Sequence, residues 1–250
     1  MTILLTNDDG IHAPALRRLR EELRDLGRVV IVAPDRDQSA TSHSLTLHRP
    51  FRIRQHEADI YSVDGTPTDC VVTAYYGLLD ARPDVVVSGI NHGPNMGEDV
   101  FYSGTVAAAI EGAFFRCTSV ACSLEYTRLK PLDFARGAEL ARRVVEQIVA
   151  RRPPAGSLFN VNIPALERGP VRGIRVVPQN VAPYVEAFDR RIDPRGRVYF
   201  WTTPNFGCPD PHPDTDVTAL AEGYITVTPL QFDLTHAERL RQMSAWRWVW

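Results

Sequence analysis

The stretch that decides the fold runs from Ile3 to Gly10 and reads ILLTNDDG. Ile3–Thr6 is a short apolar run typical of a buried strand, and Ala13–Leu26 behind it has the pattern of a helix. Asp8 and Asp9 therefore fall where the strand should end, and ligands of open α/β sheets bind at the carboxyl ends of the strands. Because adjacent carboxylates repel each other, we expect a hard divalent cation there. The alternative is a helix-capping aspartate beside a solvated neighbour.

Apolar runs alternate with helical segments through the first half of the chain. The strands expected after the first are Val29–Ala33, Val85–Ser88 and Ser119–Ser123, and the other helices are Pro67–Leu79, Thr105–Phe114 and Leu132–Ala150. This alternation indicates a doubly wound α/β fold with a mostly parallel sheet. A less regular pair of strands is expected around Leu45–Arg54 and Ile60–Val63.

After the Arg-Arg-Pro-Pro run at 151–154, long proline-rich and charged loops surround the expected strands. Further strands are expected at Phe159–Ile163, Ile174–Val177, Arg195–Thr202 and Ile225–Thr228, with a loop at Pro204–Thr215. We interpret residues 1–250 as a single domain, in which about residues 180–250 include a β-hairpin and an extended arm. Trp246, Trp248 and Trp250 close the arm, and burial against another subunit is expected for such rings.

Composition argues against several classes of protein. The chain has 250 residues, a net charge of −2 and no long basic run, so no nucleic acid is expected as a stable partner. No apolar run approaches the ~20 residues of a membrane span, so no membrane partner is expected. The cysteines lack metal-finger spacing, and Cys117 and Cys122 are interpreted as buried apolar residues in a reducing cytosol. The sequence thus predicts a cytoplasmic protein.

Four segments rich in polar residues, three of which contain glycine, follow the expected strands or lie near one. They are Asn7–Ala13, Ala33–Ser44, Ser88–Asp99 and Tyr102–Thr105. In a parallel sheet such segments meet at one edge, so we expect a single site there.

The segment Ser103-Gly104-Thr105 opens an expected helix. Its hydroxyls, its free N–H groups and the helix dipole favour an anion such as phosphate, and the alternative is a capping serine with no ligand. His43 and His92 lie in the polar segments and are candidates to bind phosphate or transfer protons. No pair of histidines has zinc spacing, so Mg²⁺ or Mn²⁺ held by oxygen atoms fits better. A P-loop and a dinucleotide-binding glycine motif are both missing.

Five motifs lie in order along the chain: ILLTNDDG at 3–10, APDRDQSA at 33–40, VDGTPTDC at 63–70, SGINHGPN at 88–95 and YSGTV at 102–106. Together with residues 214–231, they resemble the SurE family of stationary-phase survival proteins, which act as 5′-nucleotidases. The resemblance spans nearly the whole chain. Two positions depart from it, because Ala15 stands where the family usually has glycine and Glu98 where it usually has aspartate.

The resemblance implies a Rossmann-like core and metal-dependent hydrolysis of nucleoside 5′-monophosphates. The positions that match the family's metal ligands would hold one divalent cation, Mg²⁺ or Mn²⁺, in each subunit, and they are Asp8, Asp9, Ser39 and Asn91. Asn7 would orient the site, while the phosphate would be held by Asn95, Ser103, Gly104 and Thr105. The resemblance also implies homodimers or homotetramers that exchange C-terminal segments.

Catalytic roles are assigned to Asp8, Asp9 and His43, but the assignment of each step stays open. Asp8 as nucleophile or base, His43 as the acid for the leaving group, and a metal-bound hydroxide are alternatives. Two other functions also stay open: a non-catalytic, metal-dependent nucleotide-binding module that regulates a stress response, and an acid phosphatase of broad specificity. The motif Asp64–Asp69 is interpreted mainly as structural, with Thr66 capping a helix.

Overall fold

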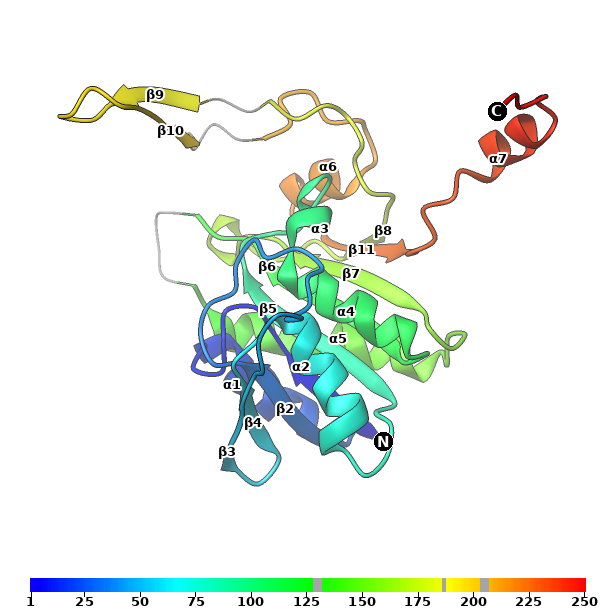
Figure 1. Ribbon diagram of the computed structural model, residues 1–250. Helices are drawn as coiled ribbons and strands as arrows, with labels where there is room; N and C mark the ends of the chain where they lie inside the picture. Colours follow the sequence, from blue (N-terminus) through cyan, green and yellow to red (C-terminus); the bar gives the residue numbers. More distant parts are fainter. Residues whose placement is uncertain (128–131, 186–187, 203–206) are drawn as a thin grey trace.

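The computed structural model describes residues 1–127, 132–185, 188–202 and 207–250. One large sheet has nine strands in the order β3-β4-β2-β1-β5-β6-β7-β11-β8 (Figure 1). These strands are β1 (Thr2–Thr6), β2 (Arg28–Pro34), β3 (Ile53–Glu57), β4 (Ile60–Val63), β5 (Val85–His92), β6 (Thr118–Leu124), β7 (Leu158–Ile163), β8 (Ile174–Val176) and β11 (Ile225–Leu230). The predicted doubly wound α/β fold is confirmed.

The central strands are parallel, and direction changes only toward the margins of the sheet. The strands β4, β2, β1, β5, β6 and β7 pair in parallel. Antiparallel pairs join β3 to β4 and β11 to β7, and β8 runs parallel to β11. Because β2 and β5 flank β1, the winding of the chain reverses at β1. This reversal is the switch point at which folds of this type bind their ligands.

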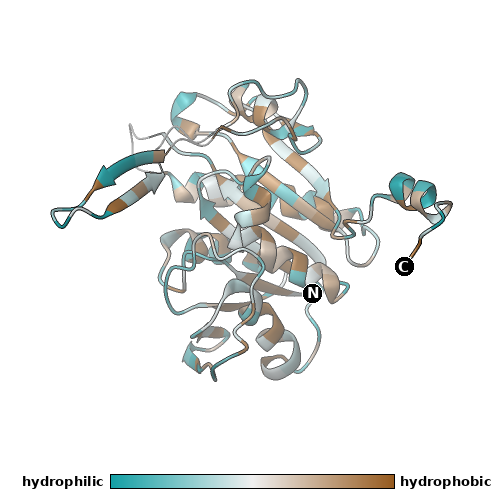
Figure 2. Cartoon of the chain, turned by 45° about the horizontal axis from the view of Figure 1, so that its top comes forward, coloured by the Kyte–Doolittle hydropathy of each residue, from teal (hydrophilic) through white to brown (hydrophobic). Residues whose placement is uncertain are grey.

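Helices cover both faces of the sheet. The helices are α1 (Pro14–Leu23), α2 (Pro67–Thr73), α3 (Asp99–Tyr102), α4 (Gly104–Phe114), α5 (Phe134–Ala150), α6 (Asp216–Ala221) and α7 (Ala237–Ser244). Alternation along β1 sends Ile3 and Leu5 to the core under α1 and α5, and Leu4 to the core under α2 and α4. All three side chains are fully buried, which stabilises the fold by about 1.5–3 kcal/mol each. The hydrophobic strands of this double core are brown in Figure 2.

Cys117 and Cys122 also lie in the core, as predicted, with 4% and 0% of their surface exposed. The Asp64–Asp69 motif is structural, as predicted. The Thr66 hydroxyl accepts a hydrogen bond from the Asp69 N–H at 3.1 Å, and the Asp69 carboxylate accepts one from the Thr66 N–H at 2.8 Å. This reciprocal capping box starts α2.

Several expected boundaries were wrong. Residues 45–52 form no strand, and the partner of β4 is β3, whose five side chains are all exposed and therefore give no apolar pattern. The expected helix at 13–26 is divided between α1 and a 3₁₀ turn at Arg24–Leu26, and the one at 67–79 continues beyond α2 as a π-helical segment, Ala74–Leu78. The loop expected at 204–215 lies partly outside the described residues.

The last part of the chain leaves the body of the molecule. β9 (Phe188–Ile192) and β10 (Val198–Thr202) form a separate antiparallel hairpin, and α7 lies at the end of an extended segment. The hairpin and α7 project on opposite sides (Figure 1). None of the helices in the described ranges is long and apolar enough to cross a membrane.

Candidate functional site

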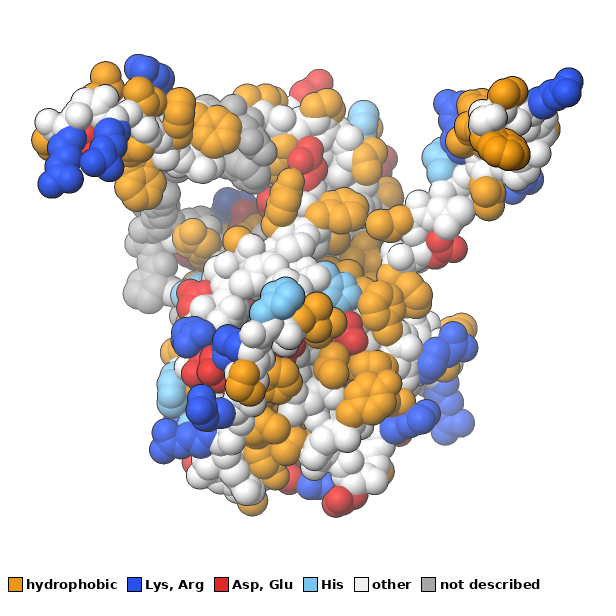
Figure 3. Space-filling view, in the orientation of Figure 1, with side chains coloured by type: hydrophobic (Ala, Val, Ile, Leu, Met, Phe, Trp, Pro, Cys, Tyr) orange, Lys and Arg blue, Asp and Glu red, His pale blue; other side chains and the backbone are white. Residues whose placement is uncertain are grey.

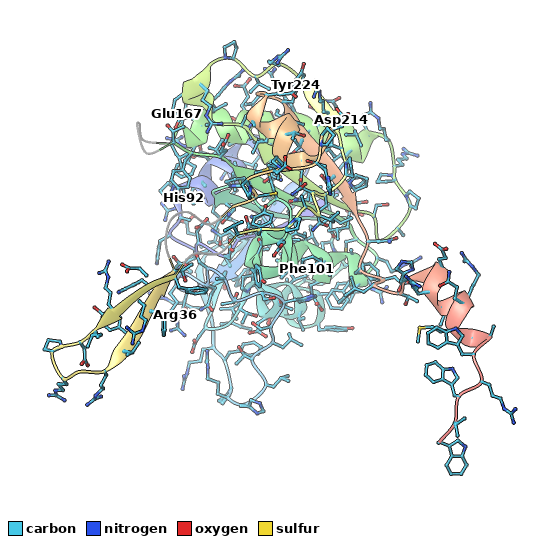
Figure 4. The ribbon with its side chains drawn as sticks, turned by 90° about the horizontal axis from the view of Figure 1, so that it is seen from above. Arg36, His92, Phe101, Glu167, Asp214 and Tyr224 are labelled. Carbon is cyan, nitrogen blue, oxygen red and sulfur yellow. The ribbon has the colours of Figure 1, made fainter. Side chains whose placement is uncertain are left out.

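A polar cleft lies at the carboxyl ends of β1 and β5, at the switch point of the sheet. Its volume is 420 Å³, and all four polar segments of the sequence contribute to its lining. The lining residues are Asp8, Asp9, Asp37, Ser39, Ala40, Asn91, His92, Pro94, Asn95, Asp99, Tyr102 and Ser103. His92 is labelled in Figure 4, which views the molecule from above. Four of these residues are aspartates and none is lysine or arginine, so the cleft is strongly acidic.

Asp8 is the more buried of the two adjacent carboxylates, with 4% of its surface exposed. Thr105 holds it, because the Thr105 N–H donates to Asp8 Oδ2 at 3.1 Å and the Thr105 hydroxyl donates to Asp8 Oδ1. Burial raises the pKa of Asp8 despite these hydrogen bonds. Burial also raises the pKa of Asp9 to about 7, and the charges of Asp8 and Asp37 add to this shift. A cation bound here would favour the ionised form of both groups.

The backbone of residues 7–13, here called the aspartate loop, is fixed from inside. The Asn7 side chain donates to the Gly10 carbonyl at 3.1 Å and accepts from the Gly10 N–H at 3.2 Å. Gly10 has a φ of +96°, and a Cβ atom there would lie 3.0 Å from the Arg36 backbone. Only glycine suits this position. Asn7 thus orients the loop rather than facing the cleft.

Ser39 and Asn91 bring neutral oxygen atoms to the acidic pair. Ser39 donates through its hydroxyl to Asp37 at 2.6 Å, and the Gln38 N–H donates to the Asp8 carbonyl at 2.8 Å, which ties the second segment to the aspartate loop. The Asn91 amide nitrogen donates to the Gly93 carbonyl at 2.9 Å. Within the described residues, Asn91 Oδ1 makes no hydrogen bond and remains able to bind a cation.

The three residues predicted at the helix start divide their roles. Ser103 lines the cleft and also caps α4, accepting from the Val106 N–H at 3.1 Å. Thr105 is fully buried and its polar groups serve Asp8. A Cβ atom at Gly104 would lie 2.9 Å from the Asp8 side chain, so glycine lets the helix approach the carboxylate closely. The Gly104 N–H makes no hydrogen bond among the described residues and remains a donor for an anion.

Asn95 is anchored by two asparagines that the sequence reading did not select. Its backbone N–H donates to Asn162 Oδ1 at 2.7 Å, while the Asn160 and Asn162 amides donate to its carbonyl at 2.7 and 3.0 Å. The Asn95 amide donates to Ser123 Oγ at 2.9 Å. Asn160 and Asn162 are fully buried in β7. Their sequence signal is two asparagines that alternate with Val161 in an apolar strand.

His43 lies outside the cleft. It lines a neighbouring, largely apolar hollow of 1010 Å³, which meets the cleft at Ser103. His43 Nε2 is 2.9 Å from Glu111 Oε2, and its ring stacks on Phe114 with 5.5 Å between centroids. Hydrophobic side chains gather across this face around α4 (Figure 3). The structure therefore does not bring His43 to the carboxylates.

Asp37 and Asp99 were also not selected from the sequence, although both line the cleft. Burial raises the pKa of Asp99 to about 6, with further contributions from Glu98 and Asp216. Glu98, which replaces the aspartate usual in the resembling family, accepts a hydrogen bond from the Tyr184 N–H at 3.3 Å. Across the described residues, no group of three or more histidine, cysteine, aspartate or glutamate side chains forms a metal cluster.

Comparison with known proteins extends the match over the whole chain. Residues 3–186 match the family described as "Survival protein SurE". The chain is 47% identical over 247 residues to "5′-nucleotidase SurE" of Vibrio cholerae El Tor, covering 98% of this chain and 97% of the relative. It is 46% identical over 250 residues to the protein of the same name in Methylococcus capsulatus, covering 98% and 97%. The crystal structure of the SurE protein from Aquifex aeolicus is 40% identical and superimposes with a TM-score of 0.87, covering 98% of both chains.

Proposed function

Because this chain belongs to the SurE family, we propose that it hydrolyses nucleoside 5′-monophosphates to nucleoside and phosphate with the help of a divalent cation. Full-length relatives that carry the name 5′-nucleotidase support the reaction. The observation that carries the proposal is the placement of Asp8 and Asp9. They lie side by side at the switch point, in a cleft that has no basic side chain from lysine or arginine to offset their charge.

The donor set fits a hard cation such as Mg²⁺ or Mn²⁺. We infer that its ligands are the carboxylates of Asp8 and Asp9 with Ser39 and Asn91, all of which line the cleft. This set has four oxygen donors, two of them charged, and contains no cysteine or histidine. Such a set is typical of Mg²⁺ and Mn²⁺ sites rather than zinc sites. When bound, one such ion per subunit would supply Lewis-acid stabilisation of the phosphoryl oxygens and activation of water.

The residues of the chain supply the remaining parts of the reaction. We infer that Ser103, the Gly104 N–H and Asn95 hold phosphate oxygens at the N-terminus of α4, where the helix dipole favours an anion. Thr105 acts through Asp8, because its N–H and hydroxyl fix the orientation of that carboxylate. A role for His43 as acid for the leaving group requires movement of its loop, since Glu111 holds the ring outside the cleft.

Phosphate release from 5′-AMP and 5′-GMP tests the proposal. We expect release with added Mn²⁺ or Mg²⁺, complete loss in excess EDTA and recovery when the metal is restored. Full activity in EDTA contradicts the metal-dependent reaction. Nucleotide binding without phosphate release would instead identify a non-catalytic, stress-regulatory module. Equal rates on nucleotides and simple phosphomonoesters under one metal would identify a broad acid phosphatase.

The exposed arm supports a proposal about assembly. Phe200, Trp201 and Trp248 are each more than half exposed in the single chain, at 60%, 59% and 65%. Large apolar side chains that are exposed together usually mark an interface. We infer a homodimer or homotetramer joined through the hairpin and the C-terminal segment. Neither a nucleic acid nor a membrane is proposed as a partner, and the unpaired state of all four cysteines supports a cytoplasmic location.

A further inference from the structure

A second polar cavity lies between α1, β3 and β4. Its volume is 200 Å³, and it is lined by Ile11, His12, Arg17, Arg20, Glu21, Arg24, Ile31, His56, Glu57 and Ile60. Ile11 and His12 belong to the aspartate loop, so residues of one loop contribute to both cavities. They share no lining residue. The second cavity is therefore a separate feature from the candidate active site.

Three arginines give this cavity its character. Arg17, Arg20 and Arg24 are three and four residues apart, so they lie on one face of the helical segment. None of the three forms an ion pair or a side-chain hydrogen bond with another described residue. Arg20 Nε is buried and without a hydrogen-bond partner in this part of the chain. Arg18, on the outer side, instead pairs with Glu21 at 3.0 Å.

The opposing charge in the cavity is smaller. Glu21 is engaged with Arg18, which leaves Glu57 as the other acidic lining residue. His12 and His56 meet edge to face, with 6.0 Å between their ring centroids. The pKa of His56 is lowered, first by burial and then by neighbours that include Arg54 and Arg17, while Glu57 opposes this shift. Three arginines and two glutamates line the cavity. The surroundings are thus net positive and favour an anion.

We propose that this cavity is a second anion site, which binds a phosphate group through Arg17, Arg20 and Arg24. The planar guanidinium group presents its donors in a fork that matches phosphate oxygens. A bound phosphate would give the buried Arg20 Nε a partner. The cavity is smaller than the ~300–1,000 Å³ typical of sites for drug-sized ligands, so it accommodates a phosphate group and not a whole nucleotide. Binding here is independent of the proposed hydrolysis.

Calorimetric titration of the full chain with inorganic phosphate tests the site. Excess EDTA is present so that a metal in the acidic cleft does not contribute. We expect one phosphate per chain, and about tenfold weaker binding for Arg17→Gln and Arg20→Gln. Arg143→Gln is the matched control, because it removes the same charge from an exposed position on α5 that pairs with Glu139. It should bind as the wild type does.

Two further measurements separate the possible outcomes. Ser103→Ala changes a proposed phosphate ligand of the cleft and should retain wild-type phosphate binding in EDTA. Loss of binding in this variant would place the anion in the cleft and overturn the proposal. Titration with 5′-AMP shows whether the phosphate group of a nucleotide also binds in this cavity. If 5′-AMP binds as tightly as inorganic phosphate and Arg20→Gln weakens both, the cavity accepts phosphate from either molecule, which supports the site. The site is contradicted if the wild type binds no phosphate. It is also contradicted if Arg20→Gln binds phosphate as the wild type does and has the same melting curve.

Discussion

The strands around the cleft bury their apolar side chains, whereas the segment after residue 180 exposes many of its own. Ile3 and Leu5 of β1 are fully buried, whereas Phe188 and Phe200 of the hairpin are 58% and 60% exposed. In the hairpin, Phe188, Phe200, Ile192 and Val198 lie on one face of the two strands, because directly paired residues share a face. Each region is regular in its backbone, but only the first has a core within the single chain.

The cleft and the arm therefore depend on different kinds of contact. The residues of the cleft are held by contacts within the chain, such as that of Thr105 to the Asp8 carboxylate and that of Asn162 to the Asn95 backbone. A two-stranded hairpin is marginal in isolation and needs another surface to cover it. We therefore expect mutations near the cleft to change chemistry or folding of one chain, and mutations in the arm to change association.

The largest expected effect comes from neutralising the carboxylates. Asp8→Asn and Asp9→Asn should each lower the rate of phosphate release from 5′-AMP by about a hundredfold or more at saturating Mn²⁺, since a poorly held metal stabilises the transition state less. Asp25→Asn is the control, because Asp25 is an exposed aspartate at the end of the first helical segment. Wild-type turnover in both cleft variants would show that the metal site has been placed wrongly.

A smaller effect is expected at the anchor of Asn95. Asn162→Ala removes two hydrogen bonds to the Asn95 backbone and leaves its N–H without that partner. Unfolding experiments in urea should show a loss of about 2 kcal/mol, which is typical for a buried polar group that loses its partner. We also expect KM for 5′-AMP to rise. Gln147→Ala, on the exposed face of α5, should change stability by less than about 0.5 kcal/mol. Equal effects of the two substitutions would contradict the anchoring role.

The arm should affect association and leave the chemistry in place. Truncation before Ser244 removes Trp246, Trp248 and Trp250, and we expect subunit association to weaken by about tenfold or more because these rings supply interface area. Light scattering over a dilution series measures the mass. The retained cleft should still bind Mn²⁺ in the truncated chain. A 28.0 kDa monomer of the full-length protein at micromolar concentration would refute the assembly.

Burial also decides which elements could be predicted from the sequence. β2 and β5 are buried on both faces, so they appear as continuous apolar runs, and their cores were located within a few residues. β3 lies at the margin of the sheet and reads Ile-Arg-Gln-His-Glu, without a buried face to impose alternation. The missed boundaries therefore lie where burial is incomplete and local sequence carries little information.

The candidate site was predictable only in part, for a related reason. Asp8 and Asp9 were selected because they directly follow a clear strand. Asn162 is 67 residues away from the Asn95 backbone that it holds, and nothing local in the sequence joins them. The segment of His43 reaches the site, but its ring lies 2.9 Å from Glu111, a contact that nothing local in the sequence indicates. The position of a residue after a strand can be predicted from its neighbours in the sequence. The residue to which a side chain hydrogen-bonds is known only from the folded chain.

The smallest expected effect concerns the stability of the metal-free cleft. Asp9 has a pKa of about 7 in the folded chain and an ordinary value of 3.8. Between these values the folded state binds more protons than the unfolded state, so the contribution of Asp9 to the free energy of unfolding falls as pH rises from about 4 to about 7. Asn cannot ionise, so in EDTA the Asp9→Asn variant should match the wild type near pH 4 and exceed it above pH 7. An advantage of about 1 kcal/mol corresponds to roughly 2–4 °C in Tm. The measurement compares melting curves of the wild type, Asp9→Asn and the exposed control Asp25→Asn at pH 4.5 and 8. If the difference in Tm between Asp9→Asn and the wild type stays constant with pH, Asp9 is not destabilised by its neighbours in the cleft.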